Sequence, residues 1–132
     1  MRNIDQIIIH CSDTPKGVYF DIEDIRNWHI NENGWMDVGY HYVILLNGDI
    51  QQGRPEKAVG AHCLGNNNRS IGICYIGGGD SEDTRTDEQK KALICLIKDL
   101  KKEYTDAKVY GHNDFSSKSC PNFNAKEEYK DL

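Results

Sequence analysis

The chain has 132 residues, of which 38% are hydrophobic and 28% are charged, and only three are prolines. This composition is typical of a folded enzyme or binding domain and excludes a disordered chain, and the length allows one domain, residues 1–132, without a second module. The net charge of −5 argues against a partner held mainly through phosphates, so we expect no nucleic-acid partner.

The N-terminal part of the chain predicts a strand followed by a helix. Gln6–His10 is an apolar run with a strand-like period of two, which places His10 and Cys11 on opposite faces. These two side chains should therefore not bind the same metal ion. Asp21 is suited to cap a helix over Ile22–Glu32, which Gly34 ends.

The middle of the chain predicts β-structure. Asn47-Gly48 separates the runs Tyr40–Leu46 and Asp49–Gln52, and it suits the positive φ angles of a type I′ hairpin turn. A further strand is expected over Ser70–Ile76, stopped by the glycines at 77–79.

A long helix and a last strand complete the pattern. Thr86 and Gln89 have the spacing of a capping box, and the helix should extend to about Tyr104. Its expected apolar stripe consists of Leu93, Ile94, Leu96, Ile97 and Leu100. A strand over Ala107–Tyr110 follows. The predicted fold class is α/β.

The N-terminus lacks a basic region followed by a long apolar stretch, and no segment approaches the length of a membrane span. We therefore expect no signal peptide, a cytoplasmic location as synthesised and no membrane partner. Five scattered cysteines are typical of reduced thiols, and Cys63, Cys74 and Cys95 are interpreted as buried small hydrophobes.

The polar residues that stand out are His10, at the end of the first strand, and His112 and Cys120, in the loop after the last strand. Two imidazoles and a thiolate suit Zn²⁺ with a fourth position left for water. Taken alone, each of these three residues is also compatible with a purely structural role. His29 is interpreted as a helix-surface or packing residue, and Trp35 as a partly buried packing residue after Gly34.

Several ordered segments of the sequence resemble one known family. They are Ile9-His10-Cys11-Ser12, Ile25-Arg26-Asn27-Trp28-His29, the run 34–42, Ala58-Val59-Gly60-Ala61-His62, Asn68-Arg69-Ser70-Ile71-Gly72-Ile73 and Lys118-Ser119-Cys120-Pro121. Together they resemble the zinc-dependent N-acetylmuramoyl-L-alanine amidases, most closely the phage lysozyme-type enzymes, which are related to peptidoglycan recognition proteins. The resemblance implies a mixed central sheet packed by helices, with the metal in a groove.

The resemblance also implies roles for individual residues. The zinc ligands, for one ion per chain, would be His10, His112 and Cys120. Tyr40 and Lys118 would be catalytic, and His62 would line the substrate groove. The expected reaction is hydrolysis of the amide between N-acetylmuramic acid and L-alanine in peptidoglycan or a muropeptide. His41 follows Tyr40 on a strand, points to the other face and is interpreted as structural.

Two positions depart from the family pattern. Some members carry a glutamate base where this chain has Cys74, so no carboxylate base is evident, and Tyr40 or the metal site would have to handle the proton. An aspartate common in relatives is Asn124 here, which either changes support of the metal or caps a helix.

Two alternative functions remain open from the sequence. A cysteine peptidase would use Cys120 or Cys11 with His112, but Pro121 follows Cys120 directly and neither thiol begins a recognisable helix. A non-catalytic peptidoglycan-binding module would not need the full ligand set. We expect a monomer, acting either as a phage or prophage endolysin or on soluble muropeptides.

Overall fold

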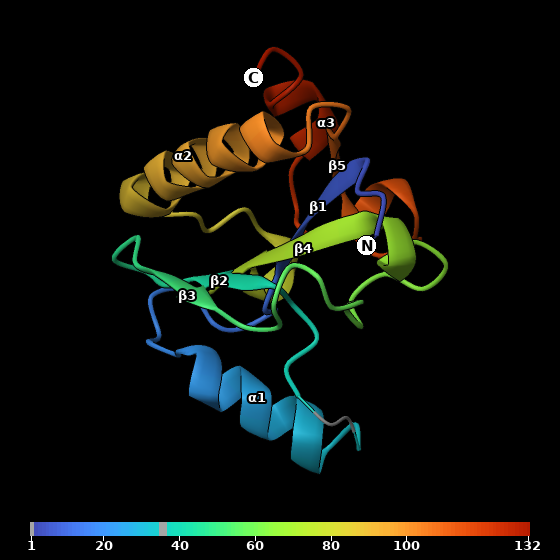
Figure 1. Ribbon diagram of the computed structural model, residues 1–132. Helices are drawn as coiled ribbons and strands as arrows, with labels where there is room; N and C mark the ends of the chain where they lie inside the picture. Colours follow the sequence, from blue (N-terminus) through green and yellow to red (C-terminus); the bar gives the residue numbers. More distant parts are fainter. Residues whose placement is uncertain (1, 35–36) are drawn as a thin grey trace.

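The structure, a computed structural model, describes residues 2–34 and 37–132 and contains a five-stranded sheet with the order β3-β2-β4-β1-β5 (Figure 1). The strands are β1 (Gln6–Cys11), β2 (Tyr42–Ile44), β3 (Ile50–Gln52), β4 (Ser70–Tyr75) and β5 (Lys108–Gly111). The α-helices are α1 (Ile22–Asn31), α2 (Asp87–Glu103) and α3 (Ala125–Glu128), and the 3₁₀ turns are η1 (Asn67–Arg69), η2 (Gly79–Ser81) and η3 (His112–Asp114). The predicted mixed sheet packed by helices is confirmed.

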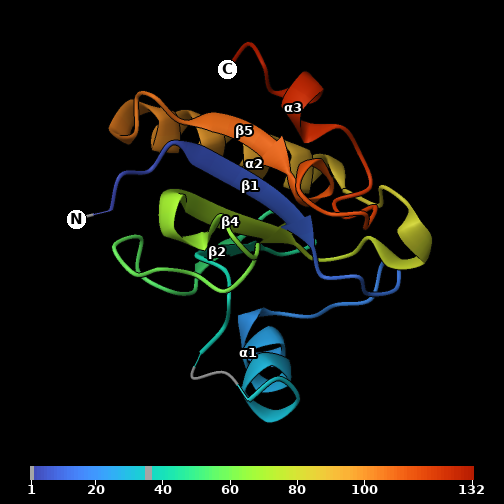
Figure 2. The same cartoon turned by 90° about the vertical axis from the view of Figure 1, so that its right-hand side faces the viewer.

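The sheet is parallel except at one edge. β1 lies between β4 and β5 and is parallel to both, and β2 is parallel to β4. β3 is antiparallel to β2 and forms the edge. Figure 2 shows β1, β4 and β5 side by side. Their carboxyl ends therefore meet at one end of the sheet, where ligands of open α/β sheets commonly bind.

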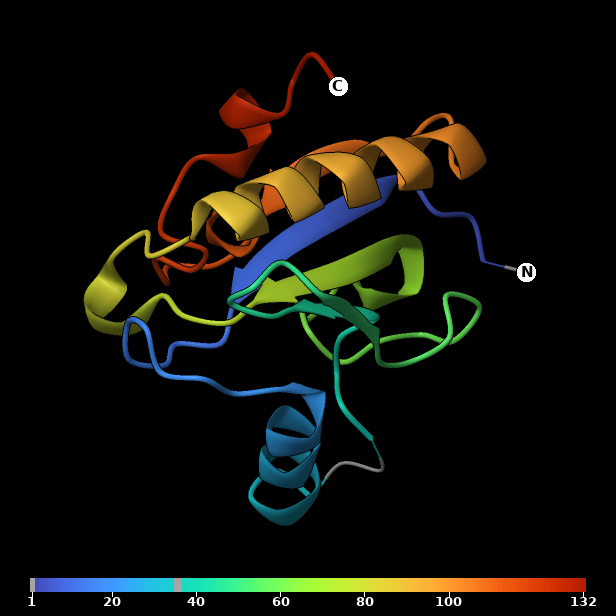
Figure 3. The same ribbon diagram turned by 90° about the vertical axis from the view of Figure 1, so that its left-hand side faces the viewer.

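Helices cover both faces of the sheet: α2 crosses one face and α1 lies on the opposite side (Figures 1 and 3). The α2 side holds the larger core, which includes Ile7, Ile9, Ile71, Ile73, Tyr75, Val109, Leu93, Ile97 and Leu100. The smaller core on the α1 side includes Ile22, Ile25, Val43, Cys74 and Ile76. Alternation along β1 turns His10 toward the α1 side, away from Ile9.

No helix among the described residues is both long and apolar enough to cross a membrane.

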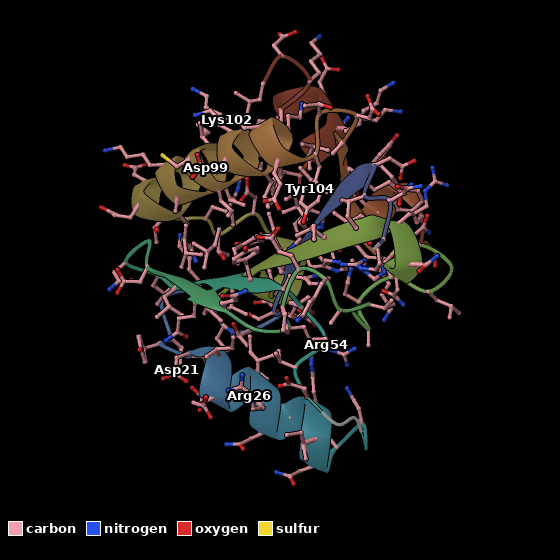
Figure 4. The ribbon with its side chains drawn as sticks, in the orientation of Figure 1. Asp21, Arg26, Arg54, Asp99, Lys102 and Tyr104 are labelled. Atoms are coloured by element: carbon pink, nitrogen blue, oxygen red, sulfur yellow. The ribbon has the colours of Figure 1, made fainter. Side chains whose placement is uncertain are left out.

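Both predicted helix starts are confirmed. The Asp21 carboxylate accepts hydrogen bonds from the Glu23 and Asp24 N–H groups, and Thr86 and Gln89 form a capping box on α2. Figure 4 shows Asp21 at the first turn of α1 and Tyr104 where α2 ends beside the sheet.

The hairpin is present, but its predicted turn type is wrong. A type I′ turn needs positive φ at both central residues. Of the two, Gly48 has a φ of 91°, whereas Asn47 does not have positive φ. The Gly48 N–H bonds the Leu45 carbonyl at 2.9 Å and the Leu45 N–H bonds the Asp49 carbonyl at 2.8 Å. This is a longer loop with one left-handed glycine, and it shortens both strands.

The expected core on α2 also needs a correction. Cys63 and Cys74 are buried as predicted, but Cys95 is exposed and Ile94 is 37% exposed. The helix contacts the sheet with a narrower stripe, Leu93, Leu96, Ile97 and Leu100, and positions 94 and 95 lie outside it. Trp35, interpreted as a packing residue, lies outside the described residues.

Arg85 joins the segment before α2 to the C-terminal helix. Its side chain is 2% exposed and forms ion pairs with Asp83 at 2.9 Å and Glu128 at 2.7 Å. It donates to the Tyr129 hydroxyl at 2.8 Å, and its guanidinium lies 3.4 Å from the Phe123 ring centroid. This cluster therefore holds the C-terminal segment against the rest of the domain.

Arg85→Gln is expected to lower the free energy of unfolding by about 3 kcal/mol, because breaking a buried ion pair leaves its partners without compensation. We place the loss at the lower end of the usual range because both carboxylates reach solvent. Urea unfolding measures it. Arg69→Gln is the control, since Arg69 is 53% exposed where it pairs with Asp5, and its midpoint of unfolding should stay close to that of wild type. Equal losses in the two variants would contradict the prediction.

The Arg85 contribution should depend on pH. Bonding to Arg85 lowers the pKa of Glu128, and it lowers the pKa of Asp83 although burial opposes this. A carboxylate with a depressed folded-state pKa stabilises the protein above its unfolded pKa, about 4, and loses that effect as the pH falls through the folded pKa. The difference in unfolding free energy between wild type and Arg85→Gln should therefore be constant from about pH 7 to pH 5 and shrink below about pH 4. A constant difference down to pH 2 would rule this out.

Candidate metal and catalytic site

The three predicted metal ligands meet at the carboxyl ends of β1 and β5. His10 is the second-last residue of β1 and is 2% exposed. His112 directly follows β5, and Cys120 lies in the loop that comes next. One nitrogen of each imidazole and the Cys120 sulfur lie within 4.8 Å of one another. Within residues 2–34 and 37–132, these are the side chains that form a group able to hold a metal ion.

The donor set fits zinc. Two imidazole nitrogens and one sulfur are ligands that Zn²⁺ takes in proteins. Burial lowers the pKa of His10 well below its ordinary value, and His62 and His112 add to the effect. Burial, then Lys118, lowers the pKa of His112. Both rings are therefore neutral near pH 7, the form of imidazole that binds metal.

The Cys120 sulfur is held by hydrogen bonding as well as by its loop. The Cys11 backbone N–H donates to Cys120 Sγ at 3.1 Å. Hydrogen bonding with the Cys11 thiol, followed by burial, raises the pKa of Cys120. A metal ion bound here must therefore displace the thiol proton. The pairing of Cys11 with Cys120 was not evident from the sequence, because it depends on a main-chain group.

The loop that carries Cys120 is tied to the domain by the two residues that directly follow the cysteine. The Tyr75 hydroxyl donates to the Pro121 carbonyl at 2.7 Å. The Asn122 amide donates to the Gly78 and Glu82 carbonyls, both at 2.8 Å. No sequence pattern signals these bonds, since they join an irregular loop to distant elements.

A cleft of about 820 Å³ opens beside the three predicted metal ligands. All six residues singled out from the sequence line it: His10, Tyr40, His62, His112, Lys118 and Cys120. The Tyr40 ring centroid lies 5.2 Å from that of His10. Burial, with nearby thiols adding, raises the pKa of Tyr40 well above its ordinary value, so its hydroxyl stays protonated.

His62 lines the cleft and also contacts His10, one of the predicted metal ligands. Its Nδ1 is 2.9 Å from His10 Nε2, and its Nε2 is 3.2 Å from the Ser70 hydroxyl. The Ser70 hydroxyl in turn donates to the Asn66 carbonyl at 2.8 Å. Burial, with like-charge repulsion from His41 and His112 and from Arg2 and Arg54, lowers the pKa of His62 to about 3, so the ring is neutral. The contact between His62 and His10 was not predicted from the sequence.

The structural interpretation of His41 is confirmed. The residue is fully buried, and its Nδ1 accepts the Gly72 N–H at 3.0 Å. Its Nε2 lies 2.8 Å from the Ala58 carbonyl. His29 packs as predicted, and its ring centroid also lies 5.5 Å from that of Tyr40, a contact that the sequence did not indicate.

The structure places both residues that depart from the family pattern, Cys74 and Asn124. Cys74 is fully buried in β4. Asn124 accepts the Glu127 N–H at 3.1 Å and caps α3, so of the two interpretations left open the helix cap is confirmed. Asp13 is the carboxylate residue among those described that line the cleft.

Comparisons with known proteins agree with this architecture. The family described as N-acetylmuramoyl-L-alanine amidase matches residues 1–123. An endolysin of Klebsiella phage KP32 is 42% identical over 129 residues, covering 95% of this chain and 85% of the relative. The solved structure of N-acetylmuramoyl-L-alanine amidase LysC from Clostridium intestinale has a TM-score of 0.83 at 31% identity, covering 96% of this chain and 82% of that one. A mutant of the Drosophila peptidoglycan recognition protein LB, in complex with tracheal cytotoxin, has a TM-score of 0.83 at 28% identity. The match covers 100% of this chain and 83% of that one.

Proposed function

Because the chain belongs to the N-acetylmuramoyl-L-alanine amidase family, we propose that His10, His112 and Cys120 hold one zinc ion at its catalytic centre. The chain is a peptidoglycan amidase of the endolysin type. The observation that carries the proposed site is the meeting of two neutral imidazoles and a thiol inside a cleft that also contains a protonated tyrosine and a lysine. All of these groups come from one chain, and a monomer remains the expected state.

The reaction is hydrolysis of the amide between the lactyl group of N-acetylmuramic acid and L-alanine. Water supplies a hydroxyl to the carbonyl carbon and a proton to the alanine nitrogen, which leaves as an amine. When bound, zinc supplies a Lewis acid and lowers the pKa of water. The tetrahedral intermediate carries negative charge on the former carbonyl oxygen.

We assign to Tyr40 and Lys118 the role of stabilising this negative charge. The Tyr40 hydroxyl remains a hydrogen-bond donor at neutral pH because burial, with nearby thiols adding, raises its pKa. The Lys118 ammonium lines the same cleft and adds positive charge. One well-placed donor to an oxyanion contributes about 3–4 kcal/mol to catalysis. His62 keeps its proposed place in the substrate groove, next to the metal ligand His10.

Peptidoglycan or a muropeptide is the ligand of this cleft. The likeness to phage endolysins and to a recognition protein in complex with tracheal cytotoxin supports this class of ligand. The expected place of action is the cell wall. The fragment size is tested by comparing hydrolysis of intact sacculi with that of soluble muropeptides, and exclusive cleavage of soluble fragments would contradict a role in lysis.

The zinc proposal is tested on the purified protein by elemental analysis. We expect about one zinc per chain. Release of L-alanine N-termini from purified peptidoglycan should stop after chelation and return when zinc is restored. Zinc without release would favour the peptidoglycan-binding module, and release that survives removal of all metal would overturn the proposed centre.

A further inference from the structure

The metal ligand His10 stands at the end of a chain of hydrogen bonds whose direction can be deduced. The chain runs from His10 Nε2 through both nitrogens of His62 to the Ser70 hydroxyl and the Asn66 carbonyl. The Asn66 carbonyl can only accept, so the single hydroxyl proton of Ser70 is used in that bond.

The positions of the remaining protons follow from the position of the Ser70 proton. With its proton committed, the Ser70 oxygen must accept from His62, so His62 carries its proton on Nε2. A neutral ring protonated on Nε2 has a lone pair on Nδ1. His62 Nδ1 therefore accepts a proton donated by His10 Nε2. His10 is left with a bare Nδ1, and no protein group among the described residues forms a hydrogen bond with that nitrogen.

We propose that Ser70 and His62 are positioning residues that hold His10 in the Nε2-protonated tautomer, leaving Nδ1 free to bind the metal ion. This inference rests on the proposed function only in assigning His10 as a ligand. It gives His62 a role beyond lining the groove. Hydrogen bonds to the second nitrogen of a metal-binding histidine fix the ring orientation and tautomer, and their loss typically lowers metal affinity about 10- to 100-fold.

The strand next to His10 is built to accept the His62 ring. A Cβ atom on Gly72 would lie 2.6 Å from His62 Cγ and 2.8 Å from His62 Nδ1. A Cβ atom on Gly60 would lie 2.7 Å from His62 Cδ2. Glycines on two different segments therefore leave the space in which the ring faces His10. This packing is independent of the hydrogen-bond argument.

The direct test is the tautomeric state of the histidines in the metal-free wild-type protein, read from long-range ¹H–¹⁵N correlation spectra of the imidazole rings. We expect His10 and His62 both to be protonated on Nε2. A His10 ring protonated on Nδ1 would overturn the inference. This measurement needs neither zinc nor substrate, so failure of the zinc proposal and failure of this inference are distinguishable.

Variants then connect the tautomer to metal binding. Ser70→Ala should lower zinc affinity about 10- to 100-fold, measured by competition with a chromophoric chelator, and Ser70→Thr should restore it because the hydroxyl is kept. Ser119→Ala is the matched control: it removes a hydroxyl next to the ligand Cys120 without touching His62, and its zinc affinity should equal that of wild type. Unchanged affinity in Ser70→Ala, or an equal loss in Ser119→Ala, would contradict the inference. Backbone amide spectra establish that each variant is folded.

Gly72→Ala tests the same arrangement without altering any member of the chain. The added Cβ should displace the His62 ring from His10 and lower zinc affinity to a similar extent as Ser70→Ala. It should also shift the His10 ring resonances in the metal-free protein. A folded Gly72→Ala protein with wild-type zinc affinity and unshifted His10 resonances would be evidence against the positioning role.

Discussion

Cys120→Ala is expected to abolish zinc binding and amidase activity together. The two remaining imidazoles would have to hold the ion without the anionic sulfur, which is one of three protein ligands in the proposed site. Loss of a group that only orients a ligand already costs ~10- to 100-fold in affinity, and loss of the ligand itself should exceed that. Zinc content and release of L-alanine N-termini measure the two effects on one preparation.

Cys95→Ala is the matched control for this change. It removes a thiol from the exposed side of α2, outside the cleft, and should leave zinc content and activity at wild-type values. Because Cys120 lies in a loop tied down by Tyr75 and Asn122, the variant should stay folded. Full zinc content in folded Cys120→Ala would remove Cys120 from the site. Retained metal with lost activity would instead revive the thiol as the nucleophile of a cysteine peptidase.

The regular elements could be predicted because their signals are local. Short apolar runs define β1 and β4, and the capping residues Asp21 and Thr86 mark the helix starts within a few residues of chain. The resemblance to an amidase family then named six residues that the fold brings into one cleft, although His10 and Cys120 lie near opposite ends of the sequence.

What could not be predicted depends on contacts between distant segments. The Asn47-Gly48 pair suits several turns, and packing of Gly48 against Glu88 of α2 accompanies the longer loop that is found. Cys95 follows two apolar residues, but the face of α2 that is buried against the sheet consists of Leu93, Leu96, Ile97 and Leu100 and leaves Cys95 outside. The bond between His62 and His10 requires the space above Gly72, which no period in the sequence reveals.

Tyr40→Phe is expected to keep the metal and lose most of the turnover. Phenylalanine preserves the aromatic ring, whose centroid lies 5.2 Å from that of His10 and 5.5 Å from that of His29. The proposed metal ligands should therefore stay in position. The variant lacks only the hydroxyl proposed to donate to the oxyanion. Removing one such donor typically lowers kcat about 10²- to 10³-fold.

The division between kcat and KM decides whether the hydroxyl acts in this way. An interaction made only in the transition state lowers kcat and kcat/KM equally, whereas a contact that binds substrate raises KM with kcat unchanged. We expect the first pattern, with zinc content equal to that of wild type. Tyr19→Phe, which alters a tyrosine that is 61% exposed and outside the cleft, should change neither constant. A Tyr40→Phe enzyme with undiminished kcat would assign the oxyanion to Lys118 and the metal alone, and one that loses its zinc would make Tyr40 a support of the ligands instead of a catalytic residue.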